Sequence, residues 1–293
     1  HKNYKFKKIN LKEFNKLYKI IIDFKPNIVF HTAAETHVDR SITDSKSFIE
    51  SNILGTYYLL EALKKYLSLN KSNKNFKFIH ISTDEVFGSL DNKRIKPFSE
   101  NSKFYPNSPY SSTKACSDIL VRAWNKTYKV PTIITNCVNN FGPWQFPEKL
   151  IPVVIYSCIN KFSIPVYGSG KNIREWIYVE DHVDYLIKIS KKGKIGNSYN
   201  IGSGIELENI SIIKKICKYF DKKFPQNKSH YSLVKHIKDR PAHDFRYALN
   251  TTKINEILNI KTYNNFDNNL KKTIDWYLEN KKWIKKKHNY INK

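Results

Sequence analysis

Two adjacent carboxylic acids, Asp84 and Glu85, follow two hydroxyl residues in the segment Ser-Thr-Asp-Glu-Val-Phe-Gly, residues 82–88. Apolar and polar side chains alternate over residues 76–81, as in a short strand, and Gly88 interrupts the pattern. The acids therefore fall at the carboxyl end of a predicted strand, where open α/β sheets bind ligands. When their surroundings differ, one carboxyl group stays protonated while the other ionises, so the pair can move protons on neighbouring carbon atoms.

A tyrosine and a lysine four residues apart, Tyr110 and Lys114, open an apolar-periodic segment that runs through Trp124. On a helix these two side chains share one face, about 5–6 Å apart at their β-carbons. A nearby ammonium group favours phenolate and lowers a tyrosine pKa that is ordinarily about 10. Tyr110 is therefore a candidate general base near neutral pH. Each motif alone also occurs on ordinary protein surfaces, and it is their order along the chain that favours chemistry.

The segment 82–88 followed by Tyr-x-x-x-Lys at 110–114 resembles the extended short-chain dehydrogenase/reductase superfamily, and within it the nucleotide-sugar 4,6-dehydratases. Related epimerases and decarboxylases usually lack the acidic pair, so Asp84 and Glu85 favour a dehydratase. The resemblance runs from about residue 4 almost to the C-terminus. It implies a Rossmann-type, doubly wound parallel sheet with a smaller α/β substrate domain. It also implies NAD as the cofactor, the nucleotide sugar dTDP-glucose as the substrate, and a homodimer.

The implied reaction oxidises the sugar at carbon 4, eliminates water across carbons 5 and 6, and returns the hydride to carbon 6. Tyr110, with Lys114 beside it, would remove the proton of the 4-hydroxyl group while hydride passes to NAD. Glu85 would then take the proton of carbon 5 as Asp84 gives a proton to the departing hydroxyl group. Thr83 would hold the 4-oxygen by a hydrogen bond. The cofactor carries the redox chemistry, and the protein supplies position and proton transfer.

The resemblance also assigns binding residues, and it assigns no metal ligand. Lys149 and Arg174 suit a diphosphate, because ammonium is a positive point charge and guanidinium forks two hydrogen bonds onto phosphate oxygens. Besides Tyr110 and Lys114, the residues expected at the cofactor are Asn10, Leu11, Thr32, Ala33, Ala34, Glu35, Ser51 and Asn140. Besides Thr83, those expected at the substrate are Thr36, Asn139, Lys149, Leu150, Pro165, Tyr167, Arg174, Asn200, Asp239 and His243.

Several features depart from the family pattern. Asn10 stands where the family has aspartate, residues 136–138 read Asn-Cys-Val in place of Arg-Cys-Ser, and Ala242 replaces a glycine. If position 242 needs a positive φ, alanine there costs roughly 1 kcal/mol. The glycine-rich loop that would hold the pyrophosphate is absent from the sequence. We therefore expect a preceding piece on the order of 50 residues, a size based on the usual βαβ unit and on the family resemblance.

Alternating and helical apolar periods predict the elements that position these residues. The expected strands are a remnant over 4–11, a buried parallel strand from 28 that leads into small residues through 35, and strands over 131–137 and 231–237. Helices are expected over 11–24, about 45–63, 181–189, 210–220 and 252–283. The resemblance implies an NAD-binding domain of residues 1–142 plus 175–202 and a nucleotide-sugar domain of residues 143–174 plus 203–293. It places the dimer face on the 45–63 helix and the Tyr110 helix.

Composition excludes some classes of protein and leaves others open. The chain has 293 residues, 40% of them hydrophobic, so it can bury a sizeable core. Only six of its 51 basic residues are arginine, and the lysines are scattered, so the net charge of +25 favours compositional bias over nucleic-acid binding. No apolar run approaches the roughly 18 residues of a membrane span, and a cytoplasmic protein is expected. Three alternatives stay open: a dehydratase or epimerase using another nucleotide, an inactive fragment, and a nucleic-acid binder with salt-dependent affinity.

Overall fold

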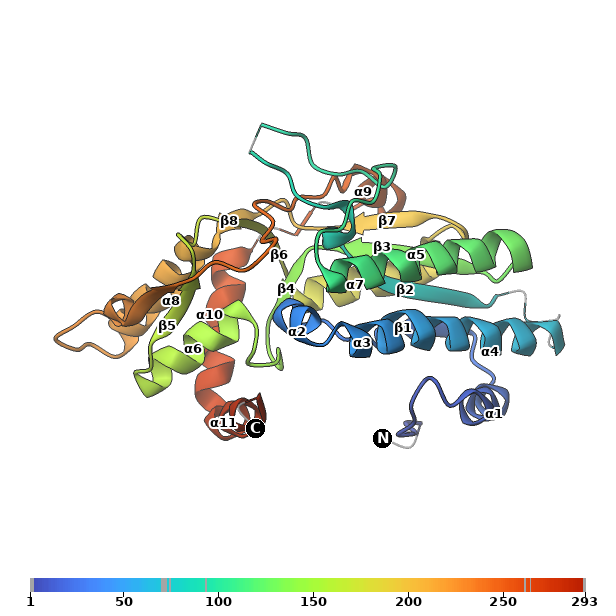
Figure 1. Ribbon diagram of the computed structural model, residues 1–293, viewed down its shortest axis with the longest axis horizontal. Helices are drawn as coiled ribbons and strands as arrows, with labels where there is room; N and C mark the ends of the chain where they lie inside the picture. Colours follow the sequence, from blue (N-terminus) through green and yellow to red (C-terminus); the bar gives the residue numbers. More distant parts are fainter. Residues whose placement is uncertain are drawn as a thin grey trace. The chain divides into compact units, whose positions relative to one another are not determined.

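The computed structural model describes residues 3–69, 73, 75–92, 94–260, 262–263 and 265–291, and it divides into two compact units (Figure 1). Unit 1 comprises His1–Val86, Pro106–Asn136 and Ser190–Tyr199. Unit 2 comprises Phe87–Tyr105, Cys137–Ile189 and Asn200–Lys293. Each unit therefore combines segments that lie far apart in the sequence. The assignment of one domain to NAD and the other to the nucleotide sugar stays a prediction.

A sheet with the strand order β1-β2-β3-β7 lies mainly in unit 1. Strand β1 is parallel to β2, with Ile28 opposite Lys77 and His31 opposite His80. Phe78 and Ile79 of β2 are fully buried, as expected of a strand with a neighbour on each side. The parallel pairing confirms the α/β fold class. The strands are β1 Ile28–His31, β2 Lys77–Thr83, β3 Thr132–Cys137 and β7 Ser198–Ile201.

The helices of unit 1 bury apolar stripes against this sheet. Leu17 and Ile21 of α1, four residues apart, join Leu59, Leu63 and other residues of α4 in one core cluster. Each such side chain contributes about 1.5–3 kcal/mol on full burial. In Figure 1, α4 and α5 run alongside each other, and α5 also contacts β2. The elements are α1 Phe14–Phe24, α2 Val38–Thr43, α3 Ser45–Phe48, η1 Ile49–Leu54, α4 Gly55–Leu69, the 3₁₀ turn η2 Asp84–Phe87 and α5 Pro109–Tyr128.

Three expectations for unit 1 need correction. Residues 4–11 form no strand, because none of the described residues pairs with them. Strand β1 is only partly buried, with Phe30 42% exposed, since β2 is its one neighbour among the described strands. The helix expected over 45–63 is divided, because Ile49–Leu54 adopts the wider π-helical winding between α3 and α4.

Unit 2 combines two small sheets with long amphipathic helices. One sheet has the order β4-β6-β8, with β4 parallel and β8 antiparallel to β6, and in the other β5 is parallel to β9. Its core includes Ile155 of α6, Ile216 of α8 and Ile274 of α10. The elements are β4 Asn139–Phe141, α6 Leu150–Asn160, β5 Ile164–Tyr167, β6 Ile173–Tyr178, α7 Val179–Lys192, β8 Glu206–Glu208, α8 Asn209–Lys223, η3 His230–Leu233, β9 Val234–Ile237, α9 Thr252–Leu258, α10 Phe266–Glu279 and α11 Lys281–Ile291.

Two expectations for unit 2 are also adjusted. The strand expected over 231–237 begins at Val234, because His230–Leu233 forms a 3₁₀ turn capped by the Ser229 side chain. The single helix expected over 252–283 is broken, since Asn259 takes a left-handed conformation with φ 53° and ends α9. Among the described residues, none of the helices has the length and apolar character needed to span a bilayer.

Candidate active site

The predicted catalytic acids lie where β2 ends. Thr83 is the last residue of the strand, and Asp84 and Glu85 open the 3₁₀ turn η2. The Thr83 hydroxyl group donates to Asp84 Oδ1 at 3.1 Å and accepts from the Glu85 backbone N–H at 3.2 Å. Asp84 is buried, whereas Glu85 is half-buried. The two neighbouring carboxyl groups therefore have different surroundings, which is the condition for different protonation states.

Tyr110 and Lys114 lie in the first two turns of α5, which local sequence fixes firmly. Ser108 and Ser111 form a reciprocal capping box, and Pro109 occupies the first helical position. Lys114 is only 4% exposed, and its Nζ donates to the Ile81 carbonyl oxygen of β2 at 2.8 Å. This hydrogen bond joins the helix that carries the predicted base to the strand that carries the predicted acids.

A buried polar cluster lies behind these residues, and sequence reasoning gave it no role. Asp118 Oδ2 accepts from Ser82 Oγ at 2.8 Å and from Asn136 Nδ2 at 3.1 Å. His80 Nε2 lies 3.1 Å from Asp118 Oδ1, but the geometry makes no hydrogen bond. Burial raises the pKa of Asp118 to about 6, against the opposing charge of Lys114. The signal in the sequence was the four-residue spacing that continues from Lys114 to Asp118.

The two histidines of this cluster are held neutral. Burial, followed by the charge of Lys114, lowers the pKa of His80 well below its ordinary value. The pKa of His31 is lowered in the same direction by burial and by the neighbouring His80 and Lys114. His31 Nε2 lies 3.0 Å from the Thr56 hydroxyl group. Neither ring adds a positive charge beside Lys114 at neutral pH.

The residues expected at the cofactor in unit 1 follow β1. Thr32 and Ala33 are exposed and small, so they leave the backbone at the end of this strand open to a close approach. The Glu35 backbone N–H donates to Asn52 Oδ1 at 2.8 Å, and Asn52 Nδ2 donates to the Glu35 carbonyl oxygen and to Thr113 Oγ1. Asn52 thus holds this loop against α5. Other expected residues lie nearby in the same unit: Leu11 packs at the start of α4, Ser51 is in η1, Ala34 and Thr36 lie in the loop, and Asn10 is exposed.

Asn139 and Asn140 lie in β4 of unit 2, and His182 fixes the second of them. His182 Nδ1 is 2.8 Å from Asn140 Oδ1, and Gln145 Nε2 donates to the Asn140 carbonyl oxygen at 2.8 Å. Burial lowers the pKa of His182 to about 4, so the ring is neutral and donates through Nδ1. The side-chain amide of Asn140, which is expected to lie near the nicotinamide, therefore has a fixed orientation. Sequence reasoning missed His182.

Tyr167, Asp239 and His243 are brought together in unit 2. Asp239 Oδ1 lies 2.7 Å from His243 Nδ1, and the rings of Tyr167 and His243 meet edge to face with centroids 6.2 Å apart. Ala242 has φ 50°, which confirms that this position takes the left-handed conformation. Pro165 lies in β5 together with Tyr167, whereas Lys149 caps the start of α6 and Leu150 is its first residue.

Arg174 and Asn200 are buried and hydrogen-bonded within unit 2. The Arg174 guanidinium donates to the carbonyl oxygens of Ile173, Asp244 and Phe245, and it stacks 4.3 Å over the Tyr247 ring. Asn200 Nδ2 donates to the Phe98 carbonyl oxygen, and its backbone N–H donates to Glu100 Oε1. Both residues therefore connect separate segments of unit 2. Their expected contacts with the substrate stay predictions.

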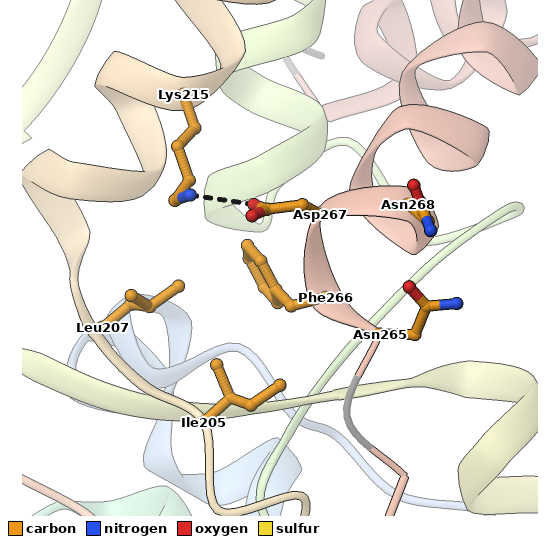
Figure 2. Close-up of a pocket in the computed structure, with 7 residues that line it drawn as sticks. All are labelled: Ile205, Leu207, Lys215, Asn265, Phe266, Asp267 and Asn268. Atoms are coloured by element: carbon orange, nitrogen blue, oxygen red, sulfur yellow. Dashed lines mark hydrogen bonds and ion pairs between the residues drawn. The ribbon is translucent and has the colours of Figure 1, made fainter.

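One pocket of unit 2 contains none of the expected residues. It has a volume of about 300 Å³, and an ion pair of 2.8 Å between Lys215 and Asp267 lies at it (Figure 2). Both side chains are substantially exposed, so the pair is worth at most about 1 kcal/mol. The remaining lining residues are Ile205, Leu207, Asn265, Phe266 and Asn268.

The parallel α/β sheet, the acidic pair at a strand end and the buried Tyr-x-x-x-Lys helix fit the expected resemblance to NAD-dependent nucleotide-sugar dehydratases of the short-chain dehydrogenase/reductase type. A family model described as GDP-mannose 4,6 dehydratase matches residues 1–273. dTDP-glucose 4,6-dehydratase 1 of Escherichia coli (strain K12) is 45% identical over 290 residues, which cover 96% of this chain and 80% of that protein. The enzyme of Neisseria meningitidis is 43% identical over 286 residues, with the same coverage of 96% and 80%.

Solved structures agree with these relatives. A double mutant of the Streptomyces venezuelae dTDP-glucose 4,6-dehydratase, with NAD and DAU bound, has a TM-score of 0.85 and 33% identity over 95% of this chain and 81% of that one. The Bacillus anthracis enzyme in complex with NAD has a TM-score of 0.84 and 34% identity over 98% and 84%. The chain belongs to the dTDP-glucose 4,6-dehydratase family. The predicted family, its NAD dependence and its lyase chemistry are confirmed.

Proposed function

We propose that this chain converts dTDP-glucose to dTDP-4-keto-6-deoxyglucose with bound NAD. The observation that carries the proposal is the placement of Thr83, Asp84 and Glu85 at the end of β2, joined to the Tyr110 helix by the Lys114–Ile81 hydrogen bond. The family model names a GDP sugar, whereas the relatives at 45% and 43% identity name dTDP-glucose. The choice of nucleotide rests on these relatives.

The residue roles follow from chemistry and burial. Tyr110 removes the proton of the 4-hydroxyl group, since the neighbouring ammonium of Lys114 favours its phenolate form. Asp84 is buried, and burial favours the neutral carboxyl group that can donate a proton to the departing 6-hydroxyl. Glu85, half-buried, is suited to ionise and take the proton of carbon 5. NAD, when bound, accepts the hydride and returns it.

Binding divides between the two units in this proposal. Unit 1 holds NAD through the exposed backbone of residues 32–35 and through Ser51, Tyr110 and Lys114, with Asn10 and Leu11 near the adenine. In unit 2, Asn140 is proposed to contact the nicotinamide. The residues of unit 2 proposed to contact the nucleotide sugar are Asn139, Lys149, Leu150, Pro165, Tyr167, Arg174, Asn200, Asp239 and His243. Thr36 and Thr83, which belong to unit 1, are also proposed sugar contacts. The cytoplasmic location stays a prediction.

A homodimer is part of the same proposal. Four exposed apolar side chains lie on η1, α4 and α5 of unit 1: Ile49, Leu54, Tyr57 and Ile119. The two long helices already contact each other, with the rings of Tyr57 and Trp124 edge to face at 5.8 Å. Exposed apolar groups can mark a surface that associates with another protein. Sedimentation of wild type against Ile119→Asp tests the dimer, and a monomeric wild type would contradict it.

The deciding experiment uses the protein expressed from its full coding sequence. It is incubated with NAD and dTDP-glucose, and in parallel with UDP-glucose and CDP-glucose, and the 4-keto-6-deoxy product is measured. We expect product from dTDP-glucose at a rate at least about tenfold above the others, the factor that about 1.4 kcal/mol gives. Bound NAD without any product from dTDP-glucose would contradict the proposed substrate.

A further inference from the structure

One buried carboxyl group of unit 1 has no part in the reaction described so far. Asp118 lies on the face of α5 that carries Tyr110 and Lys114, one turn further along, and it is 1% exposed. Its atom Oδ2 accepts two hydrogen bonds, from Ser82 of β2 and from Asn136 of β3. A single oxygen atom thus joins one helix to two strands. Burying a carboxyl group is costly, and an apolar residue would pack here without that cost.

Ser82 and Asn136, which donate hydrogen bonds to Asp118, are both also connected to Thr83. Ser82 precedes it in the chain, and Asn136 Nδ2 also donates to the Thr83 carbonyl oxygen at 3.1 Å. The backbone just before Thr83 is held as well, because Lys114 Nζ donates to the Ile81 carbonyl oxygen. Three successive residues of β2 are therefore fixed to α5, either directly or through Asn136.

We propose that Asp118 is a positioning residue for the dehydration. Its Oδ2 sets the spacing between the helix that carries Tyr110 and the strand end that carries Thr83, Asp84 and Glu85. The inference rests on the proposed function. A displacement of about 1 Å at reacting groups can lower a rate on the order of a hundredfold.

The geometry allows a variant that keeps the hydrogen bonds and removes the charge. In Asp118→Asn the amide oxygen can occupy the place of Oδ2 and accept from Ser82 and Asn136. Its nitrogen then faces the neutral His80 ring, which lies 3.1 Å from Oδ1. Asp118→Leu has the same branching and number of side-chain heavy atoms, but its side chain accepts no hydrogen bond. The two variants therefore differ in whether they can join the strands to the helix.

The test measures kcat, the KM for dTDP-glucose and the thermal midpoint of each protein, with rates normalised to folded enzyme. Asp118→Leu should lose kcat by about a hundredfold with KM within about twofold, because positioning is lost while the nucleotide contacts proposed for unit 2 remain. The kcat of Asp118→Asn should stay within about threefold of the wild-type value, because the amide oxygen still accepts both hydrogen bonds. If Asp118 had only a structural role, Asp118→Leu would lower the thermal midpoint and leave kcat per folded molecule unchanged.

Each outcome decides the proposal. A folded Asp118→Leu with wild-type kcat overturns it, and so does an Asp118→Asn as slow as Asp118→Leu. If Asp118→Leu does not fold, Ser82→Ala and Asn136→Ala decide: a fall in kcat of about tenfold with unchanged KM supports positioning, and unchanged kcat in both overturns it.

An inactive wild type would count against the proposed function alone, and the positioning would then be judged by amide hydrogen exchange at Thr83–Glu85. Exchange about tenfold faster in Asp118→Leu than in Asp118→Asn supports it, because only the first variant loses both hydrogen bonds that Ser82 and Asn136 donate to position 118. Equal exchange in the two variants overturns it.

Discussion

The strand end of unit 1 and the loop 239–243 of unit 2 hold polar side chains in two different ways. Thr83, Asp84 and Lys114 are buried on regular elements and are fixed by short hydrogen bonds to strand and helix. In the loop, the Asp239 side chain is 50% exposed, although its partner His243 is largely buried. Burial lowers the pKa of His243, and the hydrogen bond that its ring donates to the Asp239 carboxylate opposes that change.

The difference matches the work proposed for each region. Groups that react with one another need fixed spacing, which helices and strands provide. Groups that recognise a ligand are commonly carried by loops on a rigid framework. Substitutions at the strand end should therefore act on kcat, and substitutions in the loop should act on KM or on stability.

The largest loss is expected for Tyr110→Phe, which removes the base for the first hydride transfer. We expect kcat to fall by about ten-thousandfold, at the upper end of what general base catalysis contributes. No reduced cofactor should form when the nucleotide sugar is added. The absorbance of NADH in a single turnover measures this step, and normal cofactor reduction would show that Tyr110 is not the base.

Glu85→Gln should separate the two halves of the reaction. The cofactor is still reduced, because Tyr110 and Lys114 are intact, but the proton of carbon 5 is no longer removed. We expect product formation to fall by about a thousandfold while NADH accumulates. Exchange of the carbon 5 proton with deuterated water gives a second measure. An equal loss of cofactor reduction and elimination would count against the role of Glu85.

The buried carboxyl group should make stability depend on pH in the direction opposite to that of His243 in the loop, because the pKa of Asp118 is raised and that of His243 is lowered. Asp118 has a folded-state pKa of about 6 against an ordinary value of 3.8. Between these values the folded chain binds more protons than the unfolded chain, so the free energy of unfolding falls as pH rises. A pKa difference of about two units changes the free energy of unfolding by roughly 3 kcal/mol.

Asp118→Asn removes this titration. Relative to wild type, its free energy of unfolding should therefore rise by about that amount between about pH 4 and about pH 7. Urea denaturation at several pH values measures the difference, in which the titration of all other groups cancels. A difference that stays constant with pH would show that Asp118 titrates at its ordinary value.

Asp239→Asn should affect binding. It replaces a charged partner of His243 with a neutral one, and a charge-assisted hydrogen bond is worth about 1.5–3 kcal/mol. We expect KM for the nucleotide sugar to rise about tenfold with kcat within about threefold, since the reacting groups are proposed to lie in unit 1. Steady-state kinetics measures both constants. A fall in kcat without a change in KM would show that the loop acts on the reaction step, as the strand end is proposed to do.

The sequence predicted the elements that carry chemistry better than it predicted their surroundings. The acids at the end of β2 and the helical face of Tyr110 and Lys114 follow from local periodicity and capping. Asp118 and His182 escaped notice because their roles depend on partners 18 to 42 residues away, Asn136 and Asn140. Such pairings are set by tertiary packing, which a single sequence does not display.

Predictions based on isolated segments were less secure. Residues 4–11 have strand-like composition, but a strand also needs a neighbour, and none of the described residues supplies one. The helix expected over 252–283 contains a turn at Asn259 that apolar periodicity does not reveal. In contrast, the departure at position 242 was readable, because a family glycine often marks a positive φ.

The smallest effect is expected for Ala242→Gly in the loop. Alanine at φ 50° carries a strain of about 1–2 kcal/mol that glycine avoids, whereas glycine gives the unfolded chain an advantage of about 0.4–1 kcal/mol. The balance favours the variant by about 0.5 kcal/mol, or a rise in the thermal midpoint of about 1–2 °C. Calorimetry measures this shift, and kcat should not change.

Ala123→Gly in the middle of α5 is the matched control, because the same substitution there meets right-handed helical backbone. It should lower stability by about 1 kcal/mol. The two variants therefore shift the midpoint in opposite directions if backbone conformation decides the outcome. A loss of stability in both would show that the loop around position 242 relaxes its strain elsewhere, and that regular elements and this loop respond to glycine alike.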